Sequence, residues 1–300
     1  MVPINLEYLT ATTRETPYDK LTSVKVKTHH TSRSKLVLDF IDYLSRPIYW
    51  LYERQLLRTV KKQIVLPSHI GIIMDGNRRF ARNFGLDARA GHNYGADKAR
   101  EVLNWCLELG IRHVTLWGFS TDNRNRTQKE VDHLHLLFAE QARLMLEDQE
   151  LHQKGVRIRI IGNINNFPEA SKVALREMER ATQNYRGLNL NVALGYGGRE
   201  EIVSAMKKLL EQKNEEGISL EQLTQSLDAH DIGHHLYTAG IPDPDFVIRT
   251  SGEIRLSGFL LWQTAYSEFY FCDAFWPNFR KIDFLRALRH FQARERRFGQ

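Results

Sequence analysis

Cysteine is scarce in this sequence, and its two copies, Cys106 and Cys272, lie far apart in apolar surroundings. This spacing excludes a disulfide framework and a cysteine metal site, and it is typical of reduced core residues in a cytoplasmic protein. No run of about 18 apolar residues occurs, so we expect no membrane-spanning helix. The first residues lack the charged, apolar and small-residue order of a signal peptide, which also favours the cytoplasm.

Common nucleotide and nucleic-acid motifs are missing as well. The sequence contains neither the GxxxxGK[ST] of a phosphate-binding loop nor the GxGxxG of a dinucleotide fold. It has no zinc-finger, RNP or basic-zipper signature, so we expect no nucleic-acid partner. The net charge of +6 and the pI near 9.2 instead suit anionic partners such as phosphorylated metabolites or an anionic membrane, without choosing between them.

The chain of 300 residues, 42% hydrophobic and 26% charged, is long enough for one large globular domain with extensions. Residues 1–34 are rich in Thr, Lys and Ser without periodicity, which predicts a mobile tail. Residues 35–66 carry a helical apolar pattern, which predicts an amphipathic extension. This extension either packs on the main domain, residues 67–300, or contacts a membrane peripherally through Tyr49, Trp50 and basic flanks.

The main domain alternates strand-like and helical patterns, which predicts an α/β fold with a largely parallel sheet flanked by helices. The predicted strands are Ile70–Met74, His113–Phe119, Val156–Ile161, Leu188–Leu194 and Phe246–Ile248. The predicted helices are Gly95–Leu109, Gln128–Gln153, Pro168–Tyr185 and Glu200–Gln212. A further apolar run, Phe259–Trp262, is also typical of a short buried strand.

Polar loops follow several of these strands. Residues 75–79 (DGNRR) end the first strand, and a glycine-rich basic loop over residues 82–95 leads into the next helix. Residues 119–126 and 195–199 follow two further strands. Because ligands of open α/β sheets bind beyond the carboxyl ends of the strands, we expect these loops to meet at one rim. The helix N-terminus after residues 82–95 would favour an anion, whereas an Asp-Gly turn with surface arginines is the alternative for residues 75–79.

Residues 245–271 place two arginines, several hydroxyl groups and a carboxylate between apolar runs. Arg249, Arg255 and Ser257 are suited to cradle a diphosphate, because guanidinium groups bind phosphate oxygens in a bidentate way. Glu268 adds a carboxylate, and a carboxylate beside a phosphate site usually requires a cation such as Mg²⁺. A solvated turn is the alternative for these residues taken alone.

Four segments together resemble the sequence blocks of one enzyme family. They are HIGIIMDGNRRFAR, GFSTDNRNR, NVALGYGGREEIV and DPDFVIRTSGEIRLSGFLLWQTAYSEFYF, in that order and spacing. From Pro67 to Phe298 the chain is similar to the cis-prenyltransferases, the Z-isoprenyl diphosphate synthases that include undecaprenyl diphosphate synthase. Its closing segment most resembles the actinobacterial branch that contains short-chain Z,E-farnesyl diphosphate synthases.

The resemblance implies a Mg²⁺-dependent, homodimeric enzyme with an apolar tunnel. Such an enzyme condenses isopentenyl diphosphate with an allylic diphosphate (dimethylallyl, geranyl or farnesyl) and forms a Z double bond. Asp75 and Glu268 match metal-binding carboxylates, and Asn77 and Asn123 match catalytic positions proposed to assist proton removal. The positions that match substrate-binding residues are Gly76, Arg78, Arg79, Phe80, His92, Ser120, Arg126, Arg249, Arg255 and Ser257.

Some of these positions carry a more specific expectation. By resemblance, Arg249, Arg255 and Ser257 form the isopentenyl diphosphate pocket. Arg126 matches a loop arginine that closes over substrate, and Phe80 matches an aromatic residue at the substrate entrance.

The hydrocarbon chain of the product requires an apolar tunnel. Two apolar stripes at helical spacing, within residues 99–106 and 131–145, are suited to line it, although without the family both would be ordinary core. Gly118 occupies a wall position where short-chain members carry a bulky residue, so the tunnel would remain open there. The closing segment favours a short product and Gly118 a longer one, and the sequence does not decide between them.

Three positions depart from the family pattern. Arg78 replaces a frequent glycine, Ala88 replaces an arginine for which the adjacent Arg89 is a candidate substitute, and Ile254 replaces a histidine.

The alternative to an active enzyme is a non-catalytic scaffolding subunit of a heteromeric prenyltransferase, but such subunits usually lack the first-motif aspartate. A phosphate-ester hydrolase would need a second acid near Asp75, and the DGN sequence provides none.

Overall fold

The computed structural model of the chain describes residues 49–63, 65–122 and 126–294. These residues all belong to one compact unit, Arg46–Gln300. The predicted tail and the first part of the predicted helical extension lie outside the described residues, and so does the predicted catalytic residue Asn123.

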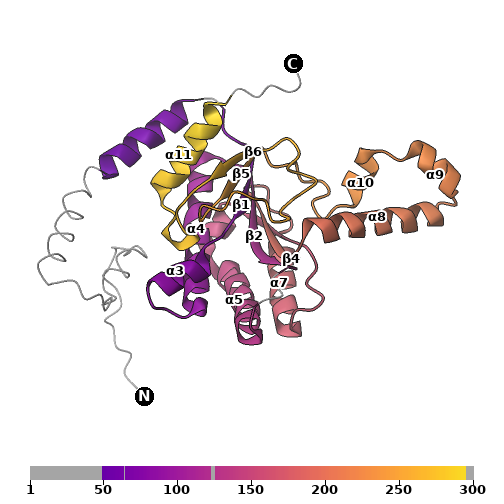
Figure 1. Ribbon diagram of the computed structural model, residues 1–300, viewed down its shortest axis with the longest axis horizontal. Helices are drawn as coiled ribbons and strands as arrows, with labels where there is room; N and C mark the ends of the chain where they lie inside the picture. Colours follow the sequence, from indigo (N-terminus) through magenta and orange to yellow (C-terminus); the bar gives the residue numbers. More distant parts are fainter. Residues whose placement is uncertain (1–48, 64, 123–125, 295–300) are drawn as a thin grey trace, which may run out of the picture. The chain divides into compact units, whose positions relative to one another are not determined.

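A six-stranded sheet forms the centre of this unit (Figure 1). Its strands are β1 (His69–Ile73), β2 (His113–Ser120), β3 (Arg157–Ile161), β4 (Asn189–Tyr196), β5 (Phe246–Arg249) and β6 (Glu268–Phe271). Their order across the sheet is β3-β4-β2-β1-β5-β6, and every neighbouring pair is parallel. The predicted parallel α/β fold is confirmed, and the five strands predicted by alternation are present with slightly shifted ends.

Both faces of the sheet are buried, as parallel strands require. All residues of β1 are buried, with Ile70 and Ile72 on one face and Gly71 and Ile73 on the other. A side chain at Gly71 would collide with Phe259, because a Cβ there would lie 2.9 Å from the Phe259 ring. The glycine therefore allows an aromatic ring to lie directly on this face.

The predicted strand Phe259–Trp262 is wrong. Residues 257–266 form consecutive turns, with positive φ at Ser257 and Leu260. Phe259 and Leu260 are fully buried in the core cluster that covers one face of the sheet. Their burial comes from packing onto the sheet and not from pairing within it, and an apolar run alone cannot distinguish these two cases.

Helices cover the face of the sheet that carries Ile70 and Ile72. Most of the buried helical residues of this cluster come from α4 (Ala88–Leu109), α5 (Gln128–Glu147), α7 (Glu169–Thr182) and α11 (Lys281–Gln292). Leu151 of α6 (Gln149–Gln153) and Trp276 of the 3-10 helix η1 (Trp276–Asn278) also belong to it. The other elements in the order are α3 (Asn77–Asn83), α8 (Gly198–Glu215), α9 (Leu220–Ser226) and α10 (Ala229–His235). Together, α8, α9 and α10 extend away from the sheet (Figure 1).

The predicted helix Gln128–Gln153 is two helices. The first, α5, ends at Glu147, and the Asp148 carboxylate accepts the N–H groups of Glu150 and Leu151 to start α6. Aspartate competes for backbone N–H groups and is therefore favoured at a helix start over a helix interior.

The predicted basic loop over residues 82–95 is largely helical. The end of α3 is Asn83, and α4 already begins at Ala88 instead of at the predicted Gly95. The Asp87 carboxylate caps α4 by accepting the Arg89 N–H at 2.8 Å. The helix start predicted at Gly95 therefore lies inside α4, and the N-terminus of α4 is capped by a carboxylate of the chain itself. That this N-terminus attracts an external anion stays a prediction.

A helix over residues 49–62 lies alongside α11 (Figure 1). Leu56 and Val60 are buried in the main core cluster, and Gln292 Nε2 donates to the Val60 carbonyl at 3.1 Å. Tyr49 and Trp50 remain exposed. Packing on the main domain is thus established for this part, while membrane contact stays a prediction. No helix among the described residues is long and apolar enough to span a membrane.

Side chains of α7 bind the outward N–H groups of β3, which is an edge strand. A strand that is paired on one side directs alternate N–H groups away from its neighbour. The Ile158 N–H donates to Thr182 Oγ1 at 3.1 Å, and the Ile160 N–H donates to Glu179 Oε1 at 2.6 Å. Burial raises the pKa of Glu179 above its ordinary value, although the bond from Ile160 opposes this shift.

Candidate active site

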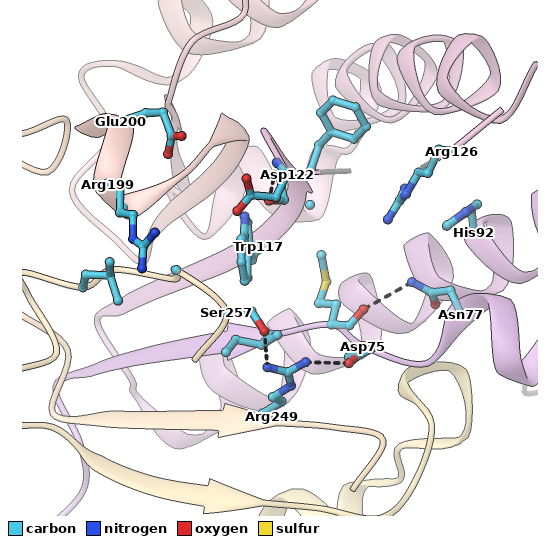
Figure 2. A pocket seen from close by; sticks show the side chains of 18 residues that line it. Asp75, Asn77, His92, Trp117, Asp122, Arg126, Arg199, Glu200, Arg249 and Ser257 are labelled. Atoms are coloured by element: carbon cyan, nitrogen blue, oxygen red, sulfur yellow. Dashed lines mark hydrogen bonds and ion pairs between the residues drawn. The ribbon is translucent and has the colours of Figure 1, made fainter. Parts of the chain in front are cut away.

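A pocket of about 630 Å³ opens at the carboxyl ends of four strands (Figure 2). It is lined by residues that end or follow β1, β2, β4 and β5, so the predicted convergence of these loops at one rim is confirmed. A smaller pocket of about 300 Å³ adjoins it. The residues that line both pockets are Met74, Asp75, Asn77, His92 and Arg126.

Asp75 lies between two guanidinium groups at this rim. Its Oδ1 accepts from Arg79 Nη2 at 3.2 Å, and its Oδ2 accepts from Arg249 Nη2 at 2.8 Å. Burial raises the pKa of Asp75, but the hydrogen bond and charge of Arg249 and the charge of Arg79 outweigh burial and hold it below its ordinary value. The carboxylate is therefore ionised at neutral pH, and with 28% exposure it remains accessible from the pocket.

Arg249 ends β5 and is only 4% exposed. Besides Asp75, it contacts Ser257 Oγ at 2.9 Å and the carbonyl of Arg255, in both cases through Nη1. Its Nε is buried and has no hydrogen-bond partner among the described residues. A buried cation is stable when it is paired and hydrogen-bonded, so this arginine is fixed by the protein and keeps one donor unused.

Arg79 connects α3 to the turn that follows β5. Its Nη2 donates to Ser251 Oγ at 2.7 Å, and its Nη1 pairs with Glu253 at 2.9 Å. Glu253 also pairs with the side chain of Arg255, which is 59% exposed. Arg255 lines neither pocket, so the structure does not bring its guanidinium to the predicted diphosphate site, and only its carbonyl contacts Arg249.

The smaller pocket concentrates positive charge around Asp75. Its cationic or titratable lining residues are Arg78, Arg79, Arg82, His92 and Arg126. Arg126 is 17% exposed, lies 5.8 Å over the Phe119 ring, and has its pKa lowered by burial. Its Nη1 is buried without a partner among the described residues. Several guanidinium groups around one cavity, of which Arg126 has an unused buried donor, suit a ligand with phosphate oxygens.

Comparison with known proteins decides the family. Residues 73–299 match the family model described as "Putative undecaprenyl diphosphate synthase". The chain belongs to this family, the cis-prenyltransferases. It is 58% identical over 257 residues to an isoprenyl transferase of Thermus thermophilus, covering 86% of this chain and 97% of that protein.

Two further proteins extend the comparison. The chain is 46% identical over 255 residues to the tritrans,polycis-undecaprenyl-diphosphate synthase (geranylgeranyl-diphosphate specific) of Methanopyrus kandleri, covering 85% of this chain and 92% of that one. Lavandulyl diphosphate synthase of Lavandula x intermedia, solved in complex with dimethylallyl diphosphate, superposes with a TM-score of 0.71 at 33% identity, covering 78% and 99%. The predicted enzyme class is thus confirmed, while the actinobacterial branch stays a prediction.

Phe80 does not lie at the substrate entrance. It is fully buried, with its ring centroid 4.8 Å from that of Phe84 and 5.6 Å from that of Tyr94. It lines neither pocket. The expected position of Phe80 is therefore wrong, because this aromatic residue packs α3 onto α4.

Glu268 does not approach Asp75 within one chain. It starts β6 in register with Phe246, whereas Asp75 follows the opposite end of β1. This register separates the two carboxylates by roughly 10 Å or more along the strands, and Glu268 pairs with Arg294 at 2.8 Å. A joint metal site would need a second chain or a rearrangement, so the metal role of Glu268 stays a prediction.

Three other predicted residues do lie at the pockets. Ser120 lines the larger pocket, and its Oγ accepts the Asp122 N–H at 3.1 Å. Gly76 lines the smaller pocket with φ 108°, a conformation that favours glycine. Asn77 Nδ2 donates to the Met74 carbonyl at 3.3 Å, and the amide oxygen is buried without a partner among the described residues.

Arg89 does not replace the arginine that is missing at Ala88. Its guanidinium pairs with Asp87 at 3.0 Å and is 60% exposed. It lines neither pocket.

In the smaller pocket, Arg82 provides a cation that the prediction of site residues missed, although the motif after the first strand included it.

The larger pocket has further lining residues that were not predicted as site residues. Among them are Trp117, Asp122, Arg199 and Glu200. The last two follow the GYGG segment, which the sequence already indicated as a rim loop. Trp117 was hidden within the apolar run of β2, because sequence alone does not show which aromatic residue of a strand borders a cavity.

A magnesium ion fits this site through one protein carboxylate. Among the residues that the structure describes, no group of three or more His, Cys, Asp or Glu side chains could hold a metal. Mg²⁺ usually binds through one or two carboxylates together with substrate phosphates and water. The ionised, accessible Asp75 beside a pocket rich in phosphate-binding groups matches this pattern.

Proposed function

We propose that this cis-prenyltransferase condenses isopentenyl diphosphate with an allylic diphosphate and forms a Z double bond in each round. The observation that carries the proposal is the position of Asp75 between Arg79 and Arg249 at two adjoining pockets. The charge of the site supports two diphosphate groups and a cation. The fold alone would not support a choice of substrate.

The two pockets suggest a division between the substrates. The allylic diphosphate would bind in the smaller pocket, near Gly76, Arg79, His92 and Arg126. Isopentenyl diphosphate would bind at Arg249, whose unused Nε donor supports this assignment. Ser257 fixes the other edge of the Arg249 guanidinium, so the donor is oriented before substrate arrives.

The side chains around Asp75 would stabilise the charge that develops when the allylic carbon–oxygen bond breaks. Mg²⁺ held by Asp75 would neutralise part of the charge of the departing diphosphate. Arg79 and Arg126 would donate hydrogen bonds to its oxygens, and because they are held in place, little reorganisation is needed. Asn77 and the predicted Asn123 would orient the reactants for proton removal, since a neutral amide is not itself a base.

The product is proposed to be a long polyprenyl diphosphate. The relative from Methanopyrus kandleri is named as an undecaprenyl-diphosphate synthase specific for geranylgeranyl diphosphate. In this chain, Gly118 lines the larger pocket and adds no side chain to its wall. Both observations favour a long product over the short product that the C-terminal segment of the sequence suggests. The hydrocarbon chain would extend into an apolar tunnel between α4 and α5.

We also propose that the enzyme is a homodimer and that residues near Tyr49 and Trp50 touch an anionic membrane. The exposed aromatic side chains at the start of the helix over residues 49–62, together with exposed Arg54 and Arg58, support membrane contact. A non-catalytic subunit of a heteromeric enzyme is less well supported, because Asp75 and its two arginine partners are all present.

The decisive experiment incubates the purified chain with Mg²⁺, labelled isopentenyl diphosphate and one primer at a time. The primers are dimethylallyl, geranyl, farnesyl and geranylgeranyl diphosphate, and products are sized by chromatography. Products of undecaprenyl length would support the proposal, whereas a single farnesyl-length product from the geranyl primer would make the enzyme a short-chain synthase. No product from any primer, with an inactive Asp75→Asn control, would favour the non-catalytic subunit.

A further inference from the structure

Glu130 has the sequence position of a helix-capping residue but does not complete the cap. The segment Thr127–Glu130 matches the capping-box pattern, in which the glutamate bonds back to the N–H of the first residue. Thr127 Oγ1 accepts the Glu130 N–H at 3.3 Å, but no return bond from Thr127 is present. In contrast, α9, α10 and α11 each complete their capping box.

The Glu130 carboxylate instead turns toward the cations of the smaller pocket. It is 7% exposed, and its Oε1 lies 3.0 Å from His92 Nε2. The same oxygen lies 3.7 Å from Arg126 Nε and 3.8 Å from Arg78 Nε. These three partners come from α4, from the segment before α5, and from α3, so one carboxylate connects separate elements of the pocket wall.

This arrangement determines which donors of Arg126 remain available. Glu130 lies on the Nε side of the guanidinium, whereas Nη1 is buried without a partner among the described residues. Figure 2 shows the side chains of Arg126 and His92 near that of Asn77 at the pocket. Among the described residues, Glu130 is the carboxylate within 4.0 Å of Arg126 and of Arg78. Without the negative charge of Glu130, the repulsion between these neighbouring cations in a partly buried site would not be compensated.

We propose that Glu130 is a positioning residue that holds His92, Arg126 and Arg78 in place for an incoming diphosphate. This inference rests on the proposed function, because it assigns the smaller pocket to the allylic diphosphate. Glu130 accepts a hydrogen bond from the Nε2–H of His92, which leaves Nδ1 as the ring atom able to face the ligand. A hydrogen bond from Nδ1 to phosphate requires the imidazolium form, and the negative charge of Glu130 stabilises that form.

The titratable groups around His92 have opposing effects. Burial lowers the pKa of His92 below its ordinary value, while the hydrogen bond and charge of Glu130 raise it. Arg126 and His133 lower it through their charge. Removal of the Glu130 charge should therefore lower the pKa of His92 further, which gives a readout that does not depend on turnover.

The test compares Glu130→Gln with Glu140→Gln. Both lie on α5 and make the same charge change, but Glu140 is exposed. The probes are inorganic pyrophosphate with Mg²⁺, measured by calorimetry, and the steady-state KM of each substrate. We expect Glu130→Gln to weaken pyrophosphate binding and to raise the allylic KM about tenfold or more. The KM of isopentenyl diphosphate should change much less, and Glu140→Gln should match the wild type.

Magnetic resonance of the His92 ring separates positioning from general damage. We expect a lower His92 pKa in Glu130→Gln at an unchanged melting temperature, with partial recovery of pyrophosphate affinity in Glu130→Asp compared with Glu130→Ala. An unchanged His92 pKa together with unchanged pyrophosphate binding would overturn the inference, as would an equal loss for both substrates. If the wild type forms no product but these shifts occur, the proposed function fails and the positioning role stands.

Discussion

Replacement of Gly118 by leucine should shorten the product. Gly118 lies in β2 and lines the larger pocket. A Cβ at this position would lie 2.9 Å from Leu194 Cδ2 and 3.4 Å from Phe138 Cε1. The branched side chain of leucine would therefore have to occupy space between these residues or point into the pocket, where the growing chain is proposed to extend.

The size of the effect follows from the excluded hydrocarbon. A leucine side chain has nearly the bulk of one isoprene unit, and each buried CH₂ contributes about 0.8 kcal/mol. Exclusion of one isoprene unit would thus cost roughly 3–4 kcal/mol, which corresponds to roughly a 100- to 1,000-fold slower extension past this point. The products should be sized by chromatography after reaction with labelled isopentenyl diphosphate and each primer.

Two controls make this prediction specific. Gly118→Ala should change the product little, because its close neighbour is the end of the flexible Leu194 side chain. Gly118→Leu combined with Phe138→Ala should restore longer products, since the Phe138 ring lies on the same side. If Gly118→Leu folds with the wild-type melting temperature and leaves the length distribution unchanged, Gly118 does not border the path of the chain.

Four further predictions follow from the site and the fold. Asp75→Ala should abolish turnover while binding of isopentenyl diphosphate, measured by calorimetry, weakens far less; equal losses would contradict the assignment. Because Arg249 and Arg79 hold the pKa of Asp75 below its unfolded value, this group should stabilise the fold above that value, and the contribution should disappear as the pH falls through the folded pKa. As the pH is lowered, the free energy of unfolding should therefore fall less steeply in Asp75→Asn than in the wild type, and identical pH profiles of this free energy would argue against the linkage. Leu56→Ala should lower the free energy of unfolding by about 2–5 kcal/mol because Leu56 is 3% exposed, whereas the exposed Leu51→Ala should remain within about 0.5 kcal/mol in denaturant titrations. Trp50→Ala with Arg54→Ala should reduce sedimentation with anionic liposomes, and unchanged sedimentation would exclude this helix as the contact.

The sequence predicted the sheet well because parallel strands are buried on both faces. Runs such as Ile70–Met74 are apolar throughout, and helical patterns separate them, so few arrangements other than a parallel α/β sheet are compatible. The same criterion failed at Phe259–Trp262, which is equally apolar but packs onto the sheet through the buried Phe259 and Leu260. Tertiary packing, and not local pattern, decides between these two outcomes.

For the site, the sequence placed the charges but not their contacts. Asp75, Arg79 and Arg249 could be assigned to one rim because each follows the carboxyl end of a parallel strand or lies in the adjoining loop. That Arg255 turns away to Glu253 depends on side-chain geometry within the turn. The register that moves Glu268 to the other end of the sheet depends on the pairing of β5 with β6, which no local pattern specifies.

The bonds from α7 to the edge strand β3 also have a consequence for self-association. Thr182 and Glu179 already accept the N–H groups of Ile158 and Ile160, which another chain would otherwise use to add a strand. An extra strand could pair there only after these two bonds were broken, which would leave the Glu179 carboxylate without its bond from the Ile160 N–H. This edge of the sheet is therefore protected against the addition of a strand from another chain.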